Sequence, residues 1–236
     1  SGPCGVYVSG KYAYVGEGTG LRIFDVSNPA SILTLATTNV NLSGVYGLQV
    51  SGKYAYVASS GNSRLCIFDI SNPSSILTKG FTGVNLGGSG GVAVMGVYVS
   101  GKYAYVTNYN NSRFCIFDIS NPDSIVTKAS TTVNLNKAYG VYVSGKYAYV
   151  TSYSGSRLSI FDVSSPGSIL TKGSTTANLN GAQGVYVSGK FAYVASENNS
   201  RLSIFSLTST DTPTFNTGAA TISNLQVYDN AQFDND

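Results

Sequence analysis

The stretch GVYVSGKYAYVTSYSGSRLSIFDVSSP, residues 140–166, recurs in closely similar form five times along the chain. Its Gly-Lys pair recurs at Gly10, Gly52, Gly101, Gly145 and Gly189, with spacings of 42, 49, 44 and 44 residues. The phenylalanine of its second half recurs at Phe24, Phe68, Phe117, Phe161 and Phe205. A repeat of about 40–45 residues that holds four short strands is typical of a propeller blade. The sequence therefore predicts an all-β, five-bladed β-propeller built from five four-stranded repeats of about 44 residues.

Each unit divides into four predicted strands, which we name a to d in chain order. In the fourth unit, strands a (140–144) and b (147–151) alternate aromatic with small or apolar residues, and Gly145-Lys146 forms a two-residue hairpin turn. Strand c covers 157–163, a turn ends at Pro166, and strand d covers 169–176. Apolar residues on both faces of a strand indicate that each sheet is covered on both sides by its neighbours.

We predict one domain, residues 1–223, followed by a tail, residues 224–236. Strand d of the fifth unit is predicted at 215–221, so that each blade comes from one continuous stretch and ring closure places unit five against unit one. The alternative is a tail segment that pairs with blade one. The tail sequence NLQVYDNAQFDND breaks the period. It is weakly similar to the repeating stalks of trimeric phage fibres and bacterial adhesins, and a frayed end is the other interpretation.

The run Leu21, Ile23, Asp25, Val26, Ser27, Asn28, Pro29 resembles the LVIVD repeat, a family of β-propeller units found in bacterial and archaeal surface or secreted proteins. The resemblance covers about residues 4–222. Its aspartate is present in four units and is replaced by Ser206 in the fifth. The resemblance implies a fold and an extracellular or cell-surface location, but no single activity. The departure is the count, since five complete units make a small ring, and that leaves open whether further blades belong to it.

Composition and charge disfavour several classes of function. The net charge is +3, and the arginines Arg22, Arg64, Arg113, Arg157 and Arg201 fall once per unit at the start of strand c, which spreads positive charge in a ring; we therefore expect no nucleic-acid partner. No apolar stretch approaches the roughly 20 residues that a membrane span needs, so we expect no membrane insertion. Cys66 and Cys115 occupy equivalent positions and are predicted to be small packed residues rather than disulfide or metal ligands.

The chain has no histidine, which excludes Ser-His-Asp triads and histidine metal sites. We predict no catalytic residue, no metal site and no cofactor. Glu17 and Glu197 are the carboxylates outside the repeat pattern on the variable side, and a closed ring would make their loops neighbours. Such a pair is the basis of a less favoured alternative, a glycoside hydrolase. Solvated loop charges are the simpler interpretation.

The repeats agree on one side of the predicted disc and differ on the other. The a–b and c–d turns are nearly constant, whereas the b–c loops and the residues that enter strand a vary from unit to unit. Variable loops on a rigid scaffold are a common place for binding, although relaxed drift of loops is the alternative. The residues predicted to bind a ligand on this side are Tyr46, Met95, Tyr109, Asn110, Asn111, Tyr139, Tyr153, Gln183, Glu197 and Asn198.

These features predict a non-catalytic recognition or display module of a cell surface or virus fibre, which binds a glycan or a protein through its variable face. A structural spacer or assembly unit of a larger fibre is the alternative, with oligomerisation through the C-terminal segment.

Overall fold

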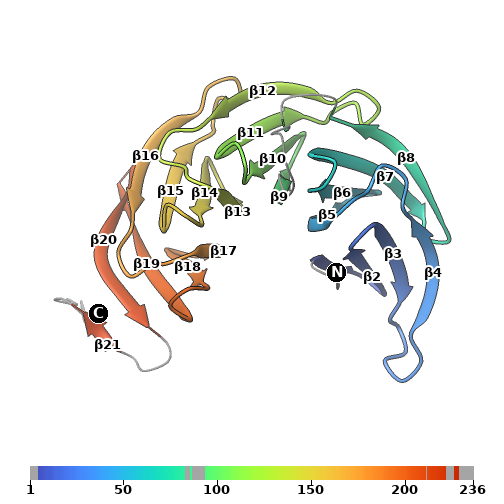
Figure 1. The fold of residues 1–236 in the computed structure, drawn as a ribbon, viewed down its shortest axis with the longest axis horizontal. Helices are drawn as coiled ribbons and strands as arrows, with labels where there is room; N and C mark the ends of the chain where they lie inside the picture. Colours follow the sequence, from blue (N-terminus) through green and yellow to red (C-terminus); the bar gives the residue numbers. More distant parts are fainter. Residues whose placement is uncertain (1–4, 83–85, 87–93, 211, 222–225, 229–236) are drawn as a thin grey trace.

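The computed structural model describes residues 5–82, 86, 94–210, 212–221 and 226–228. Within these ranges the regular secondary structure consists of β-strands. Five antiparallel sheets follow one another along the chain, and each is made from one continuous stretch. The sheets stand side by side around a common axis as the blades of a propeller (Figure 1). The prediction of an all-β fold with five propeller blades is confirmed.

The five sheets are blades one to five in chain order. Blade one contains β1 (Gly5–Ser9), β2 (Tyr12–Glu17), β3 (Gly20–Asp25) and β4 (Leu33–Thr38). Blade two contains β5 (Val45–Ser51), β6 (Tyr54–Ser59), β7 (Arg64–Asn72) and β8 (Ser75–Phe81). Blade three contains β9 (Val94–Ser100), β10 (Tyr103–Asn108), β11 (Arg113–Asp118) and β12 (Val126–Thr131). Blade four contains β13 (Ala138–Ser144), β14 (Tyr147–Ser152), β15 (Arg157–Asp162) and β16 (Leu170–Thr175). Blade five contains β17 (Ala182–Ser188), β18 (Phe191–Ser196), β19 (Arg201–Thr210), β20 (Thr212–Thr221) and β21 (Gln226–Tyr228).

The predicted strands of the fourth unit agree with β13 to β16 to within two residues at each end. The hairpin glycine between strands a and b has a positive φ in every blade, 56° at Gly145, a conformation that glycine adopts at no steric cost. In blade five the last predicted strand is present as β20, which begins three residues earlier than expected. The short β21 pairs with β20 and not with blade one. The rest of the predicted tail lies outside the described residues.

Blades one and five do not meet, and the five blades form an open arc (Figure 1). The strands β1, β5, β9, β13 and β17 pack against one another in this order, but the described parts of the first and fifth sheets share no packed interface. The expectation that unit five closes against unit one is wrong. The rotation from one blade to the next is set by interblade packing, and five such rotations do not complete a turn.

The core lies between neighbouring blades and is built from similar residues at each of the four interfaces. We call the side of a blade that packs against the next blade its forward face, and the opposite side its rear face. Between blades two and three, the forward-face residues Tyr56, Leu65 and Ile67 pack against the rear-face residues Val106 and Phe117. Equivalent residues form the other three clusters. Each large apolar side chain that is fully buried contributes about 1.5–3 kcal/mol, so these interfaces hold the blades together.

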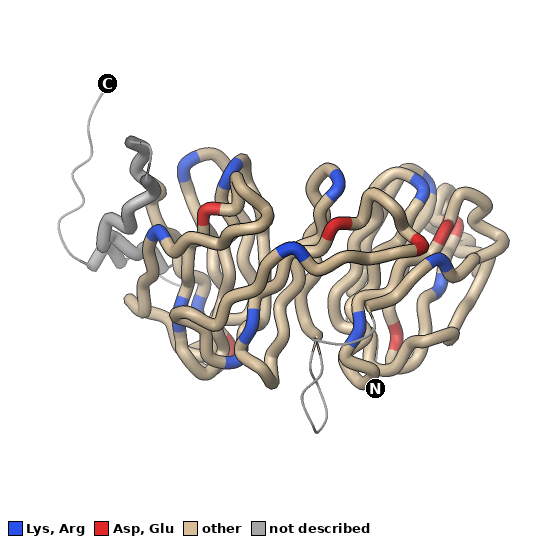
Figure 2. Tube along the Cα trace, turned by 90° about the horizontal axis from the view of Figure 1, so that it is seen from above, with Lys and Arg blue, Asp and Glu red and all other residues tan. Residues whose placement is uncertain are grey.

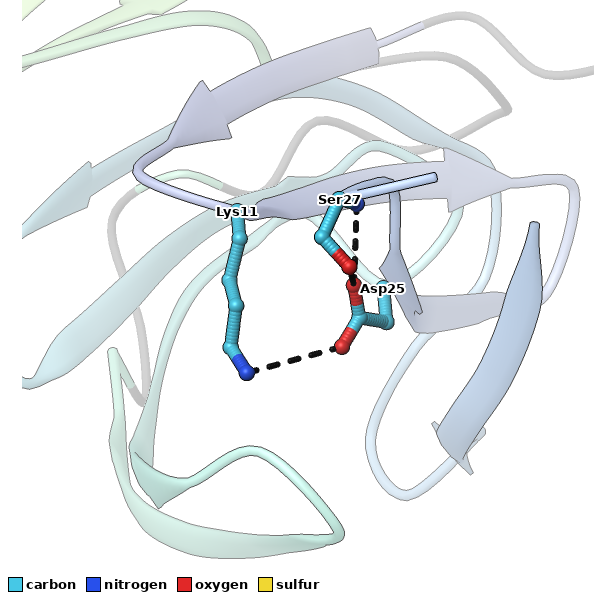
Figure 3. A network of polar contacts seen from close by, with 3 residues as sticks. All are labelled: Lys11, Asp25 and Ser27. Atoms are coloured by element: carbon cyan, nitrogen blue, oxygen red, sulfur yellow. Dashed lines mark hydrogen bonds and ion pairs between the residues drawn. The ribbon is translucent and has the colours of Figure 1, made fainter. Parts of the chain in front are cut away.

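The a–b and c–d turns form one edge of the arc, which we call the turn edge. Figure 2 views the arc from the side, with lysine and arginine positions at the tips of loops along the upper edge and acidic positions just below. In blade one, Asp25 Oδ1 accepts hydrogen bonds from the Ser27 backbone N–H at 2.9 Å and from its hydroxyl at 2.5 Å, and Lys11 Nζ lies 3.7 Å from Asp25 Oδ2 (Figure 3). The predicted structural role of this aspartate is confirmed.

The same turn recurs at Asp69, Asp118 and Asp162, each of which accepts the N–H of the serine two residues later. Side-chain hydrogen bonds from these serines are the largest cause that lowers the pKa of all four carboxyls. The turn edge is therefore one small hydrogen-bonded motif used four times.

Four arginines, rather than five, share one repeat position. Arg157 pairs in register with Ser152 at the start of β15, whereas Arg22 lies further along β3 and pairs with Val15. Arg22 stands where blade two has Cys66. Cys66 and Cys115 are buried and free, and burial raises the pKa of each thiol to about 12. They are packed, unreactive residues, as expected.

Within the described ranges, the structure holds no helix that is both long enough and apolar enough to cross a bilayer.

Candidate functional site

The opposite edge of the arc, which we call the loop edge, carries the variable segments. It consists of the b–c loops 18–19, 60–63, 109–112, 153–156 and 197–200, and the d–a connections 39–44, 132–137 and 176–181. Backbone hydrogen bonds fasten the b–c loops of blades two, four and five to the connection that enters the same blade. In blade four, Tyr153 N–H donates to the Lys137 carbonyl at 2.9 Å, and in blade five Glu197 N–H donates to the Gly181 carbonyl at 3.0 Å. The variable residues are therefore held on fixed backbone.

Three of the predicted tyrosines form a cluster on this edge. The ring centroids of Tyr109 and Tyr153 lie 6.1 Å apart, and Tyr139 lies 6.2 Å from Tyr109 and 6.3 Å from Tyr153. All three rings are half-buried, so each is held by its neighbours and keeps an accessible part. Tyr109 comes from blade three, whereas Tyr139 and Tyr153 come from blade four. The cluster thus bridges the loop edges of two blades.

Lys137 completes the cluster at one end, with Nζ 5.0 Å from the centre of the Tyr109 ring. Its φ is 56°, in the left-handed region that residues with a Cβ seldom adopt. The equivalent residues of blades two and five are Gly44 and Gly181, with φ of 61° and 68°. Blade four therefore carries a lysine in a conformation that costs about 1–2 kcal/mol, where two of its sister units carry glycine.

A polar rim borders the cluster at its other end, in blade five. Tyr153 donates its hydroxyl to Asn198 Oδ1 at 3.1 Å, and Gln183 Nε2 donates to Glu197 Oε2 at 2.6 Å. Asn198 in turn donates to Asn180 Oδ1 at 3.2 Å. The pKa of Tyr153 is raised, chiefly by its hydrogen bond to Glu197. The tyrosines are therefore flanked by a cation on one side and by amides and one carboxylate on the other.

An open hollow of about 260 Å³ lies on the same edge of blade four. Asn134, Leu135, Asn136, Gly155 and Arg157 line it. Gly155 belongs to the loop that carries Tyr153, and Asn136 immediately precedes Lys137. The hollow and the tyrosine cluster are thus built from the same two backbone segments, which are hydrogen-bonded to each other between Gly155 N–H and the Asn136 carbonyl. Its walls offer amide groups beside the aromatic rings.

The structure brings some of the predicted site residues together and separates others. Tyr109, Tyr139, Tyr153, Gln183, Glu197 and Asn198 are linked by the contacts above, and Asn110 and Asn111 follow Tyr109 in its loop. Met95 is 5% exposed, so its side chain is buried rather than presented on the surface. Tyr46 is half-buried in blade two, away from the cluster. The predicted residues that contact one another therefore lie in blades three to five.

Glu17 and Glu197 stand apart, because the arc leaves blades one and five separate. Glu17 Oε2 forms an ion pair with Arg22 Nε at 3.1 Å, whereas Glu197 accepts a hydrogen bond from Gln183. The carboxylate pair on which the hydrolase alternative depends is not assembled. Among the described residues, no three histidine, cysteine, aspartate or glutamate side chains come close enough together to hold a metal ion.

Two features that position the site are not evident from sequence. The Thr107 hydroxyl donates to the Tyr139 carbonyl, and the Thr151 hydroxyl donates to the Gln183 carbonyl at 2.5 Å. Each threonine sits on strand b of one blade and holds strand a of the next, and the equivalent residues Ala58 and Ala195 lack a hydroxyl. The signal was a threonine confined to units three and four. The other feature is Lys137, which a comparison with Gly44 and Gly181 would have singled out.

The LVIVD repeat family matches this sequence in five segments: residues 3–40, 44–81, 90–133, 136–177 and 181–204. No curated protein matches it. Among solved structures, it is similar to a protein from Lactobacillus plantarum (TM-score 0.78, 15% identity, 90% of this chain and 69% of that one). It is also similar to a putative 6-phosphogluconolactonase from Bacteroides uniformis (TM-score 0.75, 15% identity, 88% and 67%) and to a periplasmic gluconolactonase from Pseudomonas aeruginosa (0.74, 15%, 90% and 66%). At this identity the likeness shows the fold alone, and the chain spans about two thirds of the length of these structures.

Proposed function

The chain belongs to the LVIVD repeat family, and on that scaffold we propose that it is a non-catalytic recognition module, displayed outside the cell, that binds a glycan through the tyrosine cluster of the loop edge. The observation that carries this proposal is the mutual contact of Tyr109, Tyr139 and Tyr153 at 6.1–6.3 Å, on an edge where the repeats otherwise diverge. Constant residues hold the scaffold, and the divergent ones gather in one place.

The chemistry of the cluster suits a sugar. Half-buried tyrosine rings offer an apolar face to the C–H face of a pyranose. The side chains of Asn110, Gln183 and Asn198 add amide donors and acceptors of the kind that fix a ligand's orientation. The loops of blades four and five are already fastened by backbone hydrogen bonds, so ordering them costs little conformational entropy when a ligand binds.

The backbone of Lys137 supports the same proposal, because among the eight described non-glycine residues with a positive φ it is the one that is neither serine nor asparagine. Lys137 keeps a left-handed backbone conformation that its glycine counterparts adopt freely, and it places its ammonium over Tyr109. Backbone strain of this kind is concentrated at functional sites. We therefore assign Lys137 to the ligand-binding group together with the three tyrosines.

The names of two structural neighbours raise an enzymatic alternative, lactone hydrolysis. Those names belong to proteins about 15% identical to this chain, and the two loop carboxylates here are engaged with Arg22 and Gln183 at opposite ends of the arc. We therefore retain the binding proposal.

A glycan array probed with the 236-residue protein tests the proposal, followed by calorimetric titration of the glycans that bind. The double variant Tyr109→Ala/Tyr153→Ala should bind at least about tenfold more weakly, the effect of losing a central aromatic contact. The matched control is Tyr186→Ala, because Tyr186 is also exposed but lies outside the cluster. Equal glycan binding by wild type and double variant, or binding only to proteins, would overturn the assignment.

A further inference from the structure

The two ends of the arc present the two halves of an interface that the molecule builds four times in its interior. Every interior interface joins the forward face of one blade to the rear face of the next. In the described part of the chain, no blade lies behind blade one and none lies ahead of blade five (Figure 1). The residues on these two end faces are those that the repeat uses for packing.

The rear face of blade one is apolar and open. Val8 is 59% exposed, whereas its counterparts in the other four blades, Val50, Val99, Val143 and Val187, are 5–6% exposed. Val6, on the same side of β1, is 68% exposed. Phe24 is only partly buried, although the equivalent phenylalanines of the other blades are almost completely enclosed.

The forward face of blade five is open in the complementary way. Leu202 is 36% exposed, whereas Leu21, Leu65, Phe114 and Leu158 at the same position are fully buried. Tyr186 and Phe191 are also exposed there. Each end of the arc therefore exposes the half of the repeated interface that the other end lacks.

The glycines of strand a show independently that the forward face of blade five lacks a packing partner. In blades one to four, the glycine of strand a faces the strand-a carbonyl of the next blade so closely that a Cβ would meet it: at 2.9 Å from the Tyr46 oxygen for Gly5 and at 2.3 Å from the Gln183 oxygen for Gly140. Gly184 of blade five meets only Ala195 Cβ, at 3.7 Å. Glycine is thus present at this position in blade five although nothing described there requires it.

The curvature of the arc limits what can cover both faces. Five blades span 66–69% of the length of three propeller structures to which the chain is similar, which corresponds to a ring of about seven blades. A ring of seven positions leaves two empty beside this arc. If a second copy docked on blade five in the same plane, its first two blades would fill these positions and its third blade would collide with blade one. The opening thus accommodates about two blades but not five.

We propose that the end faces are covered by two further units of the same repeat, carried on the same polypeptide, so that the complete molecule is a closed ring of seven blades. Covalent attachment keeps such units at high effective concentration beside the faces that they cover. The forward face of the last added unit would pack the equivalents of Tyr56, Leu65 and Ile67 against blade one. The rear face of the first added unit would pack two valines and a phenylalanine against blade five.

One polar pair lies on the rear face of blade one. Arg22 occupies the position of the buried residues Cys66, Cys115, Ser159 and Ser203, and it is paired with Glu17 at 3.1 Å. A covering blade would enclose an ion pair that is already matched. Because the other four units carry a buried cysteine or serine here, Arg22→Ser should stabilise a closed ring more than the open arc.

The test compares chains of five, six, seven and eight units. A second copy of residues 94–181 inserted after residue 181 gives seven units, a copy of 138–181 alone gives six, and both copies give eight. The thermal midpoint should rise by several degrees more from six to seven units than from five to six, and should not rise again at eight. X-ray scattering should show the seven-unit chain as a monomeric closed disc.

Gly184→Ala provides a local readout with a matched control. It should leave the five-unit chain unchanged and lower the thermal midpoint of the seven-unit chain, whereas Gly140→Ala should lower it in both. Equal gains at every added unit would overturn the proposal. So would a five-unit dimer that Leu202→Glu dissociates, or a Gly184→Ala effect that is the same in both lengths.

Discussion

The turn edge and the loop edge are built from the same repeat, yet they differ in what they conserve. On the turn edge, four aspartates make the same hydrogen bond to a serine two residues later, and each blade closes its hairpin with a glycine of positive φ. On the loop edge, the same strands end in different side chains, and the contacts run between blades. The comparison teaches that a repeat can fix one edge by local hydrogen bonds and leave the other edge free to acquire a site.

Acid should act mainly on the turn edge, and this is the largest effect we expect. The pKa values of Asp25, Asp69, Asp118 and Asp162 are lower in the folded chain than the ordinary value of about 3.9. Their contribution to stability is therefore complete above about pH 4 and is lost as the pH falls through the folded pKa values. Thermal unfolding measured from pH 6 to pH 2 should show a steep decrease at the acid end.

The variant Asp162→Asn serves as the control for the acid experiment, because the amide cannot be protonated over this range. Its decrease between pH 4 and pH 2 should be smaller than that of the wild type. A curve of unchanged steepness would show that other groups cause the acid sensitivity.

Thr151→Ala should weaken the loop edge without touching the turn edge. It removes the hydroxyl that donates to the Gln183 carbonyl and accepts from Gly140 N–H at 2.8 Å, which leaves both partly buried groups without that bond. The expected loss of unfolding free energy is about 1–3 kcal/mol, measured by urea denaturation. Thr171→Ala on the exposed strand β16 is the comparison, and an equal loss there would contradict the assigned role.

Lys137→Gly should separate stability from binding. Glycine adopts the left-handed conformation without the cost that lysine bears, so the free energy of unfolding should rise by about 1 kcal/mol. The variant also loses the ammonium over Tyr109, so the affinity for the ligand of the loop edge should fall. Denaturation and calorimetric titration of one protein sample measure both quantities, and a variant that loses stability would refute the strain argument.

Tyr153→Phe should have the smallest effect. It keeps the ring in the cluster and removes only the hydroxyl bonded to exposed Asn198 at 3.1 Å. A change in stability of less than about 1 kcal/mol is expected. Binding should weaken less than for Tyr153→Ala, and equal losses for the two variants would mean that the hydroxyl, rather than the ring, is the contact that matters.

Much of the fold follows from the sequence because its signals are local and repeated. The Gly-Lys hairpins, the Asp-x-Ser turns and the doubly apolar strands each depend on residues close together in the chain, and five copies reinforce one another. The divergent loops were also accessible, since Tyr109, Tyr153 and Glu197 mark where the copies differ, and the binding site placed there stays a prediction. The burial of Met95 could not be read from the sequence, because variability between copies does not show whether a side chain is exposed.

The amino-acid sequence by itself determined the blade, the number of blades and which edge is constant, because these depend on contacts within about 44 residues. Only the tertiary structure decided that the five blades form an open arc, since curvature is the sum of small rotations set by side-chain packing between sheets. It also decided that Lys137, Tyr109 and Tyr139 meet, and that Glu17 and Glu197 do not. Those contacts join different units, and their distances depend on how the blades are stacked rather than on the order of residues along the chain.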